Sequence, residues 1–111
     1  MSEFENILNQ IKDNSVQEAN NEFQQLLSEA KGSSEPFIRD NSAMVKQWIV
    51  LLSNGEIDKE EFDDLIADQK LAAEQFVNTQ AIGAQARTQR LTMQLLDLTI
   101  TTIAPALLPV L

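Results

Sequence analysis

The chain has 111 residues, of which 43% are hydrophobic, and this length suits one domain with a modest core. It contains neither cysteine nor histidine, which excludes a disulfide framework, a cysteine- or histidine-ligated zinc site, and thiol or imidazole catalysis. The formal net charge is -9 and no basic patch offsets it, so we expect no binding of nucleic acid through an electropositive surface.

The composition favours helices. Only three glycines and three prolines are present, which leaves few turns, and the apolar–polar alternation of strands is absent. We therefore predict an all-α protein, a small bundle of three to four amphipathic helices with a long C-terminal helix and an apolar tail. Charge and hydropathy divide the chain into an acidic helical body at 1–77, a small and polar segment at 78–90, and an apolar segment at 91–111.

Two amphipathic helices are predicted at the start of the chain. The second begins at a capping box, in which Ser15 accepts a hydrogen bond from the amide of Glu18 while the Glu18 carboxylate reaches back. Gly32 suits the C′ position, so we expect this helix to end there. The first helix has one apolar face at i, i+3, i+4 and i+7, formed by Phe4, Ile7, Leu8 and Ile11.

A third helix is predicted between the turns at 33–34 and 53–55. Ser34 suits its N-cap, and Pro36 falls in the first turn, where the missing N–H of proline costs no hydrogen bond. This helix carries the densest apolar face of the acidic body, with Trp48 as its largest side chain. Core packing is the favoured interpretation of that face.

The fourth helix has the clearest start signal in the sequence. Asp58 and Glu61 have the spacing of a capping box, and Ile57 and Phe62 occupy the N′ and N4 positions of a hydrophobic staple. Acidic side chains crowd the first turns, where they interact favourably with the helix dipole. We expect the apolar stripe of this helix to continue to residue 77.

The stretch NGEIDKEEF at 54–62 resembles the second half of a calcium-binding EF-hand loop. The first half departs from that pattern, because Val50 and Leu52 stand where carboxylate ligands are needed. We therefore expect no tight calcium site, and we predict no other metal or cofactor. The same letters are similar to the start of short bacterial helical-hairpin domains, a likeness that covers helix capping and implies no function. The residues that fit the EF-hand pattern are Gly55, Ile57, Glu61 and Phe62.

A run of carboxylates surrounds the start of the fourth helix. A solvated face is its favoured interpretation, and contact with divalent ions or with a basic partner is the alternative. Paired carboxylates alone do not support an enzyme, because no neighbouring groups that would tune them or hold a substrate are evident. We therefore expect no catalytic activity. The acidic face consists of Glu56, Asp58, Glu60, Glu61, Asp63, Asp64 and Asp68.

Residues 91–111 are apolar and contain a single charged side chain, Asp97. A helix that is apolar nearly all round is buried in a core, in an assembly or in a bilayer. Pro105 and Pro109 are expected to end this helix near Ala104. We expect association through its large apolar side chains, which are Leu91, Leu95, Leu96, Leu98, Ile100, Ile103, Leu107, Leu108 and Leu111.

A narrow polar stripe runs along the same helix at i, i+4, i+7 and i+11. Its central aspartate disfavours a lone transmembrane helix. The stripe could instead face inward in a ring of helices, with Asp97 beside Arg90 or Arg87 of a neighbour, or lie at the exposed edge of a soluble bundle. The threonines at 92, 99, 101 and 102 are expected to bond to their own backbone or to cross between helices. The stripe consists of Arg90, Gln94, Asp97 and Thr101.

The segment at 78–90, NTQAIGAQARTQR, carries small and polar side chains with Gly83 in its middle. One interpretation is a hinge, and the other is a place where helix backbones approach closely over small residues. No proline lies in this segment, so a continuous helix from Lys59 to Ala104 is also compatible with the sequence.

These observations support a non-enzymatic structural or assembly protein that self-associates, or inserts into a membrane or a larger assembly, through residues 91–111. Burial of apolar side chains would drive the association while the acidic body keeps the chain soluble. The alternative is a soluble acidic adaptor or inhibitor that binds a basic protein partner through the face at 56–68. The expected partners are thus a second copy, another protein or a membrane, and not nucleic acid. The N-terminus carries no signal peptide, so we expect synthesis in the cytoplasm and leave the final location open.

Overall fold

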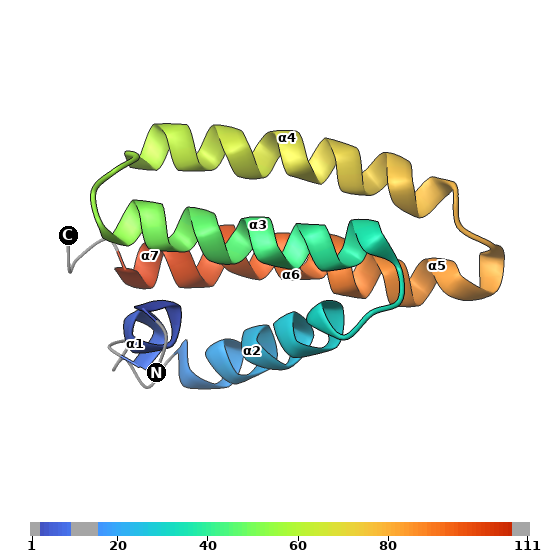
Figure 1. Cartoon of the computed structure of the whole chain (residues 1–111), viewed down its shortest axis with the longest axis horizontal. Helices are drawn as coiled ribbons and strands as arrows, with labels where there is room; N and C mark the ends of the chain where they lie inside the picture. Colours follow the sequence, from blue (N-terminus) through green and yellow to red (C-terminus); the bar gives the residue numbers. More distant parts are fainter. Residues whose placement is uncertain (1–2, 10–15, 108–111) are drawn as a thin grey trace.

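The computed structural model describes residues 3–9 and 16–107. Within these ranges the chain is helical between short turns and contains no strand, which confirms the predicted all-α class. The long helices lie side by side, and each runs antiparallel to the one before it, so that α1 and α7 lie at the same end of the bundle (Figure 1).

Helix α1 spans Glu3–Asn9 and α2 spans Gln17–Lys31. The predicted apolar face of the first helix is buried over its described part, whereas Ile11 lies outside the described residues. Ser15, on which the predicted capping box depends, also lies outside them. Val16 is the N-cap of α2 and makes no side-chain cap bond. Gly32 follows α2 as predicted, but with a φ of -87° it does not adopt the left-handed conformation of a C′ glycine.

Helix α3 spans Pro36–Ser53, with Pro36 in the first turn as predicted. The prediction of Ser34 as N-cap is wrong by one residue, because Glu35 takes that position. Ser33 serves the turn instead, since its hydroxyl accepts a hydrogen bond from the amide of Glu35 at 3.1 Å. After α3, Gly55 has a φ of 75°, a conformation that glycine adopts without steric cost.

Helix α4 spans Lys59–Asn78 and starts as the sequence predicts. The Asp58 carboxylate accepts from the amide of Glu61 at 2.8 Å, and the Glu61 carboxylate accepts from the amide of Asp58 at 3.5 Å. Phe62 is fully buried and Ile57 packs against the core, as a hydrophobic staple requires. The capping box is therefore confirmed.

The last helical stretch consists of α5 (Ile82–Gln89), the π-helical turn η2 (Arg90–Gln94), α6 (Leu95–Leu98), the π-helical turn η3 (Thr99–Ile103) and α7 (Ala104–Leu107). The junction residues all keep right-handed helical angles, so residues 82–107 form one helix, which we call the C-terminal helix. The prediction that it ends near Ala104 is wrong, because the helix continues to Leu107. Proline removes one hydrogen bond, and at Pro105 the preceding π-helical turn has already changed the bonding pattern.

A turn separates α4 from the C-terminal helix. At the end of α4 the Thr79 hydroxyl donates to the carbonyl of Phe76 at 2.7 Å, and the chain then reverses its direction (Figure 1). A continuous helix from Lys59 to Ala104 is therefore not formed. Gly83 has open space around its Cα, so no other backbone of the described residues approaches closely at that position.

The core of the bundle draws large apolar side chains from α2, α3, α4 and the C-terminal helix. Burial of each such side chain contributes roughly 1.5–3 kcal/mol relative to leaving it exposed, so the C-terminal helix is a main source of the bundle's stability. Phe37 and Phe76 add a stacked pair between α3 and α4, with ring centroids 4.4 Å apart. The large apolar side chains that are fully buried include Phe23, Ile49, Leu52, Phe62, Ile66, Leu91, Leu95, Leu96 and Ile103.

One polar pair lies inside this core, between α3 and α4. The side-chain oxygen of Asn41, which is fully buried, accepts a hydrogen bond from the amide of Gln69 at 3.0 Å. The Asn41 amide nitrogen has no hydrogen-bond partner among the described residues. An unsatisfied buried donor is costly, but a buried polar pair also favours one register of two helices over others.

Candidate functional site

The apolar side chains of residues 91–111 lie mainly inside this chain's own bundle. Leu91, Leu95, Leu96 and Ile103 are completely buried. Leu98 and Ile100 are half-buried and pack against the core. The side chains of Leu107, Leu108 and Leu111 lie outside what the structure describes. In the closed bundle, the buried leucines are therefore not available to a partner.

The polar stripe lies on the opposite, solvent-exposed side of the C-terminal helix, between α2 and α4. Arg90 forms a bidentate pair with Glu29 of α2, with nitrogen–oxygen distances of 2.7 and 3.3 Å. Gln94 donates to Glu22 of α2 at 3.3 Å. All four stripe residues are exposed, which is the edge position that the sequence left open as one alternative. We call this side of the helix, from residue 86 to residue 101, the outer face.

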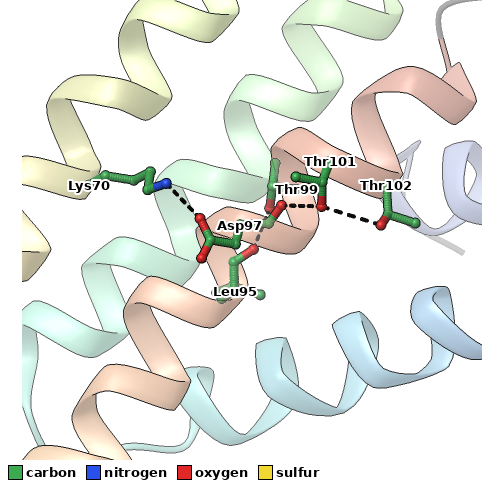
Figure 2. A network of polar contacts seen from close by, with 6 residues as sticks. All are labelled: Lys70, Leu95, Asp97, Thr99, Thr101 and Thr102. Carbon is green, nitrogen blue, oxygen red and sulfur yellow. Dashed lines mark hydrogen bonds and ion pairs between the residues drawn. The ribbon is translucent and has the colours of Figure 1, made fainter.

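The contact of the outer face with α4 is an ion pair between Asp97 and Lys70, whose charged atoms lie 2.6 Å apart (Figure 2). The Asp97 side chain is 54% exposed, so water screens this pair. The stripe thus connects the C-terminal helix to α2 through Arg90 and to α4 through Asp97. Exposed pairs of this kind contribute little to folding stability individually.

The ion pair between Arg90 and Glu29 also affects the ionisation of both groups. The hydrogen bond and the positive charge of Arg90 lower the pKa of Glu29 below its ordinary value of 4.5. The hydrogen bond and the negative charge of Glu29 raise the pKa of Arg90. Both side chains are therefore charged near neutral pH.

Threonine hydroxyls bond to the backbone of the C-terminal helix around its π-helical turns. Thr92 donates to the carbonyl of Thr88 at 2.7 Å, and Thr99 donates to the carbonyl of Leu95 at 2.8 Å. Thr101 donates to the carbonyl of Asp97 at 2.7 Å and lies 3.5 Å from the hydroxyl of Thr102 (Figure 2). Back-bonding of this kind bends helices, and π-helical turns occur frequently at functional sites.

A shallow hollow of about 420 Å³ lies along the outer face. Its lining residues all come from the C-terminal helix between Ala86 and Asp97, and the half-buried Met93 is one of them. The predicted polar stripe supplies Arg90, Gln94 and Asp97 to this surface, whereas Ala86, Gln89 and Met93 were not predicted to share it. The spacing of seven residues between Ala86 and Met93 is the signal that places these two on one side of a helix.

The acidic face at 56–68 divides into two groups of side chains. Asp58 and Glu61 belong to the capping box, and Asp63 pairs with Lys59 at 2.8 Å. The other members are exposed and form no ion pair within residues 3–9 and 16–107. In that same part of the chain, no group of three or more acidic side chains could hold a metal ion. The exposed members are Glu56, Glu60, Asp64 and Asp68.

A second cleft, of about 360 Å³, lies between α1, α2 and α3 and was not predicted from the sequence. Phe4, Leu8 and Leu27 contribute its apolar part. Lys31 and Lys46 also line it, and the Lys46 ammonium lies 5.3 Å from the centre of the Phe4 ring. Contacts between helices far apart in sequence create this cleft, so no local pattern indicates it.

Among the described residues, no helix has both the length and the hydropathy that crossing a bilayer requires. Comparison with models of protein families, with curated proteins and with solved structures found no match for this chain.

Proposed function

We propose that this protein is a non-enzymatic assembly component that self-associates, or docks on a larger assembly, through its C-terminal helix. The observation that carries the proposal is the outer face, which combines a hollow, a half-buried methionine and one charge of each sign on a single helix. Of the residues predicted to drive association, Leu91, Leu95, Leu96 and Ile103 are buried in the core of the closed bundle. We therefore assign the association to the opposite side of the same helix.

The distribution of charge supports this choice of surface. Residues 1–77 carry 16 acidic and 6 basic side chains, a net charge of -10, whereas residues 78–111 carry Asp97 against Arg87 and Arg90, a net charge of +1. Two copies that meet through their acidic bodies would repel each other. Contact through the C-terminal helix brings together the least acidic parts of the two chains.

Sedimentation velocity of the full-length protein over a range of concentrations tests this proposal. We expect a defined oligomer that grows with concentration and is in equilibrium with the monomer. A species that stays monomeric at every concentration, and that binds no other component of its source, would contradict it. Contact of residues 91–111 with lipid remains a prediction, and flotation with neutral and anionic liposomes measures it in the same preparation.

The second candidate function is a soluble acidic adaptor or inhibitor that binds a basic protein. The specific observation in its favour is a ridge on α4, where Glu60, Asp64 and Asp68 follow each other at intervals of four residues and are exposed. This spacing places the three carboxylates on one side of the helix. These carboxylates form no ion pair with a basic side chain of the described residues. They are therefore available to form ion pairs with a basic helix or peptide.

Binding of a polylysine peptide tests the adaptor function. We expect the triple variant Glu60→Gln, Asp64→Asn, Asp68→Asn to bind it more weakly than the natural chain. A matched control removes the same charge elsewhere, through Glu18→Gln, Asp40→Asn and Glu74→Gln. Equal loss in both triple variants would show that only net charge matters and would exclude a specific acidic face.

A further inference from the structure

The outer face has a symmetry in its charges that a second copy of the chain can use. Arg90 and Asp97 are seven residues apart, or roughly 10.5 Å along a helix at 1.5 Å per residue. The midpoint between them falls between Met93 and Gln94. Met93 is half-buried, and both residues line the hollow. One apolar side chain thus lies at the centre of the surface, with opposite charges on its two sides.

Two such faces can meet in two orientations, and the charges distinguish them. In a parallel pair, Arg90 would oppose Arg90 and Asp97 would oppose Asp97, and both contacts would be repulsive. In an antiparallel pair related by a twofold axis near Met93, Arg90 of each copy opposes Asp97 of the other. Both contacts are then attractive, so the charges favour the antiparallel orientation.

The ion pairs within each chain are compatible with this arrangement. Glu29 holds Arg90 and Lys70 holds Asp97 in the single chain. Across an antiparallel interface these four groups form a row of alternating sign, in the order Glu29, Arg90, then Asp97 and Lys70 of the second copy. The pairs within each chain need not break, and they hold the interacting side chains in fixed positions. Charged rows of this kind set the orientation and register of an interface.

The shape of the face agrees with the same orientation. The twofold axis that relates Arg90 to Asp97 also relates Ala86 to Thr101, because both pairs are centred between residues 93 and 94. Ala86 and Thr101 are small and exposed, so the two helices can approach each other closely at both ends of the contact.

We propose that two copies of this chain dock antiparallel through the outer faces of their C-terminal helices, with Arg90 of each copy against Asp97 of the other and Met93 at the twofold axis. This inference rests on the proposed function and names its partner, its orientation and its register. The bundles stay closed, and their buried leucines take no part in the contact.

Single cysteines test the orientation directly, because the chain has no cysteine of its own. We expect Met93→Cys to form a disulfide-linked dimer on mild oxidation. Ala86→Cys alone and Thr101→Cys alone should not cross-link. In the antiparallel pair, the introduced cysteine of one copy lies roughly 22 Å, measured along the helix, from the same cysteine of the other copy. An equimolar mixture of these two variants should give the linked heterodimer. Gln47→Cys, at an exposed position of α3, is the control for random collisions.

Charge reversal provides the second measurement, with sedimentation velocity as the readout and circular dichroism as the check on folding. Arg90→Glu alone and Asp97→Arg alone should each be monomeric, whereas their equimolar mixture should associate like the natural chain. Recovery of association in the mixture cannot come from ion pairs within one chain. Arg90→Glu has lost the pair with Glu29, and Asp97→Arg has lost the pair with Lys70.

The outcomes separate this inference from the proposed function. If the natural chain is monomeric, the inference fails, and the proposed function fails with it unless the monomer binds another component of its source. If it is oligomeric but Ala86→Cys links to itself, the contact is parallel and the inference fails alone. An oligomer in which neither Met93→Cys nor the mixture of Ala86→Cys and Thr101→Cys cross-links above the Gln47→Cys control uses another surface, and this outcome also overturns the inference while the assembly function stands.

Discussion

Individual side chains attach the C-terminal helix to its neighbours and give the bundle its register. Arg90 reaches Glu29 on α2, and Asp97 reaches Lys70 on α4, so one exposed edge of the helix is held from two sides. Inside the bundle, Asn41 meets Gln69 between α3 and α4. These two groups of contacts respond to different conditions, because water and salt screen the exposed ion pairs, whereas the contact between Asn41 and Gln69 is uncharged and partly buried.

The pair between Glu29 and Arg90 predicts a dependence of stability on pH. Arg90 lowers the pKa of Glu29 in the folded chain below 4.5, so the pair stabilises the fold above that pH. This contribution is lost as the pH falls through the lowered pKa. We expect Glu29→Gln to lower the free energy of unfolding in urea at about pH 7 and to change it less at about pH 3. Glu74→Gln, an exposed glutamate on α4, is the control. An equal effect of Glu29→Gln at both values would contradict the account.

The unsatisfied amide of Asn41 predicts a stabilising substitution. Asn41→Leu keeps the number and branching of the heavy side-chain atoms and removes a buried donor that has no partner, so we expect the free energy of unfolding to rise by about 1 kcal/mol. Gln69 is only half-buried and can turn its amide to water. Asn41→Ala should instead destabilise the fold, because it leaves a cavity. If chemical denaturation shows that Asn41→Leu is destabilising, the asparagine amide must be satisfied in solution.

At the scale of elements, local interactions determine where α4 starts, whereas packing determines how far the C-terminal helix extends. Asp58 and Glu61 bond to each other's backbone within three residues. The C-terminal helix passes Pro105 and contains two π-helical turns, and its buried side chains are spread over all of its length. Tertiary burial therefore overrides a local signal that would end the helix.

The capping box of α4 predicts a difference between two neighbouring aspartates. Asp58→Ala removes the N-cap acceptor and should lower the free energy of unfolding by about 1 kcal/mol. Asp64→Ala removes the same charge from an exposed position of the same helix and should change it by less than about 0.5 kcal/mol. Thermal or urea unfolding measures both. An equal loss of free energy of unfolding in both variants would mean that negative charge near the start of α4 stabilises the fold and that the N-cap hydrogen bond does not.

The sequence predicts features that depend on few neighbouring residues. The all-α class and the start of α4 follow from patterns within about one turn of helix. Back-bonding of Thr92, Thr99 and Thr101 was one of two alternatives that the sequence left open. The pair between Arg90 and Glu29 joins residues 61 positions apart, and no local pattern predicts it. The π-helical turns likewise depend on packing.

The same limit applies to the outer face. Its polar stripe is visible in the sequence at helical spacing, and the structure places all four members on one exposed side. Which side of the helix faces the core was ambiguous, because apolar side chains cover most of its circumference. Only the packing of α2 and α4 against the helix shows that Leu91, Leu95 and Leu96 point inward.

At the scale of the whole molecule, the C-terminal helix has two sides with different roles. Its inner side supplies leucines and an isoleucine to the core shared with α2, α3 and α4. Its outer side carries the hollow and the exposed charges that we assign to association. The acidic surface of the remaining bundle keeps other contacts between copies unfavourable.

Truncation after Arg90 tests the structural role of this helix. The shortened chain loses Leu91, Leu95, Leu96 and Ile103 from the core, and the loss of several such side chains is comparable with the whole stability of a small domain. We expect an unfolded or molten chain by circular dichroism and by one-dimensional NMR. A folded, soluble truncation product would mean that the acidic body is a domain by itself, and that residues 91–111 are an appendage.

Amide hydrogen exchange in the full-length protein measures most directly whether the bundle stays closed while the outer face associates. Amides of the core exchange through global unfolding, whereas locally opened segments exchange faster. We predict that the amides of residues 91–103 are among the slowest in dilute protein and remain slow in concentrated, associated protein. If these amides exchange faster on association, the helix leaves the bundle to associate, and its leucines would then be the contact surface.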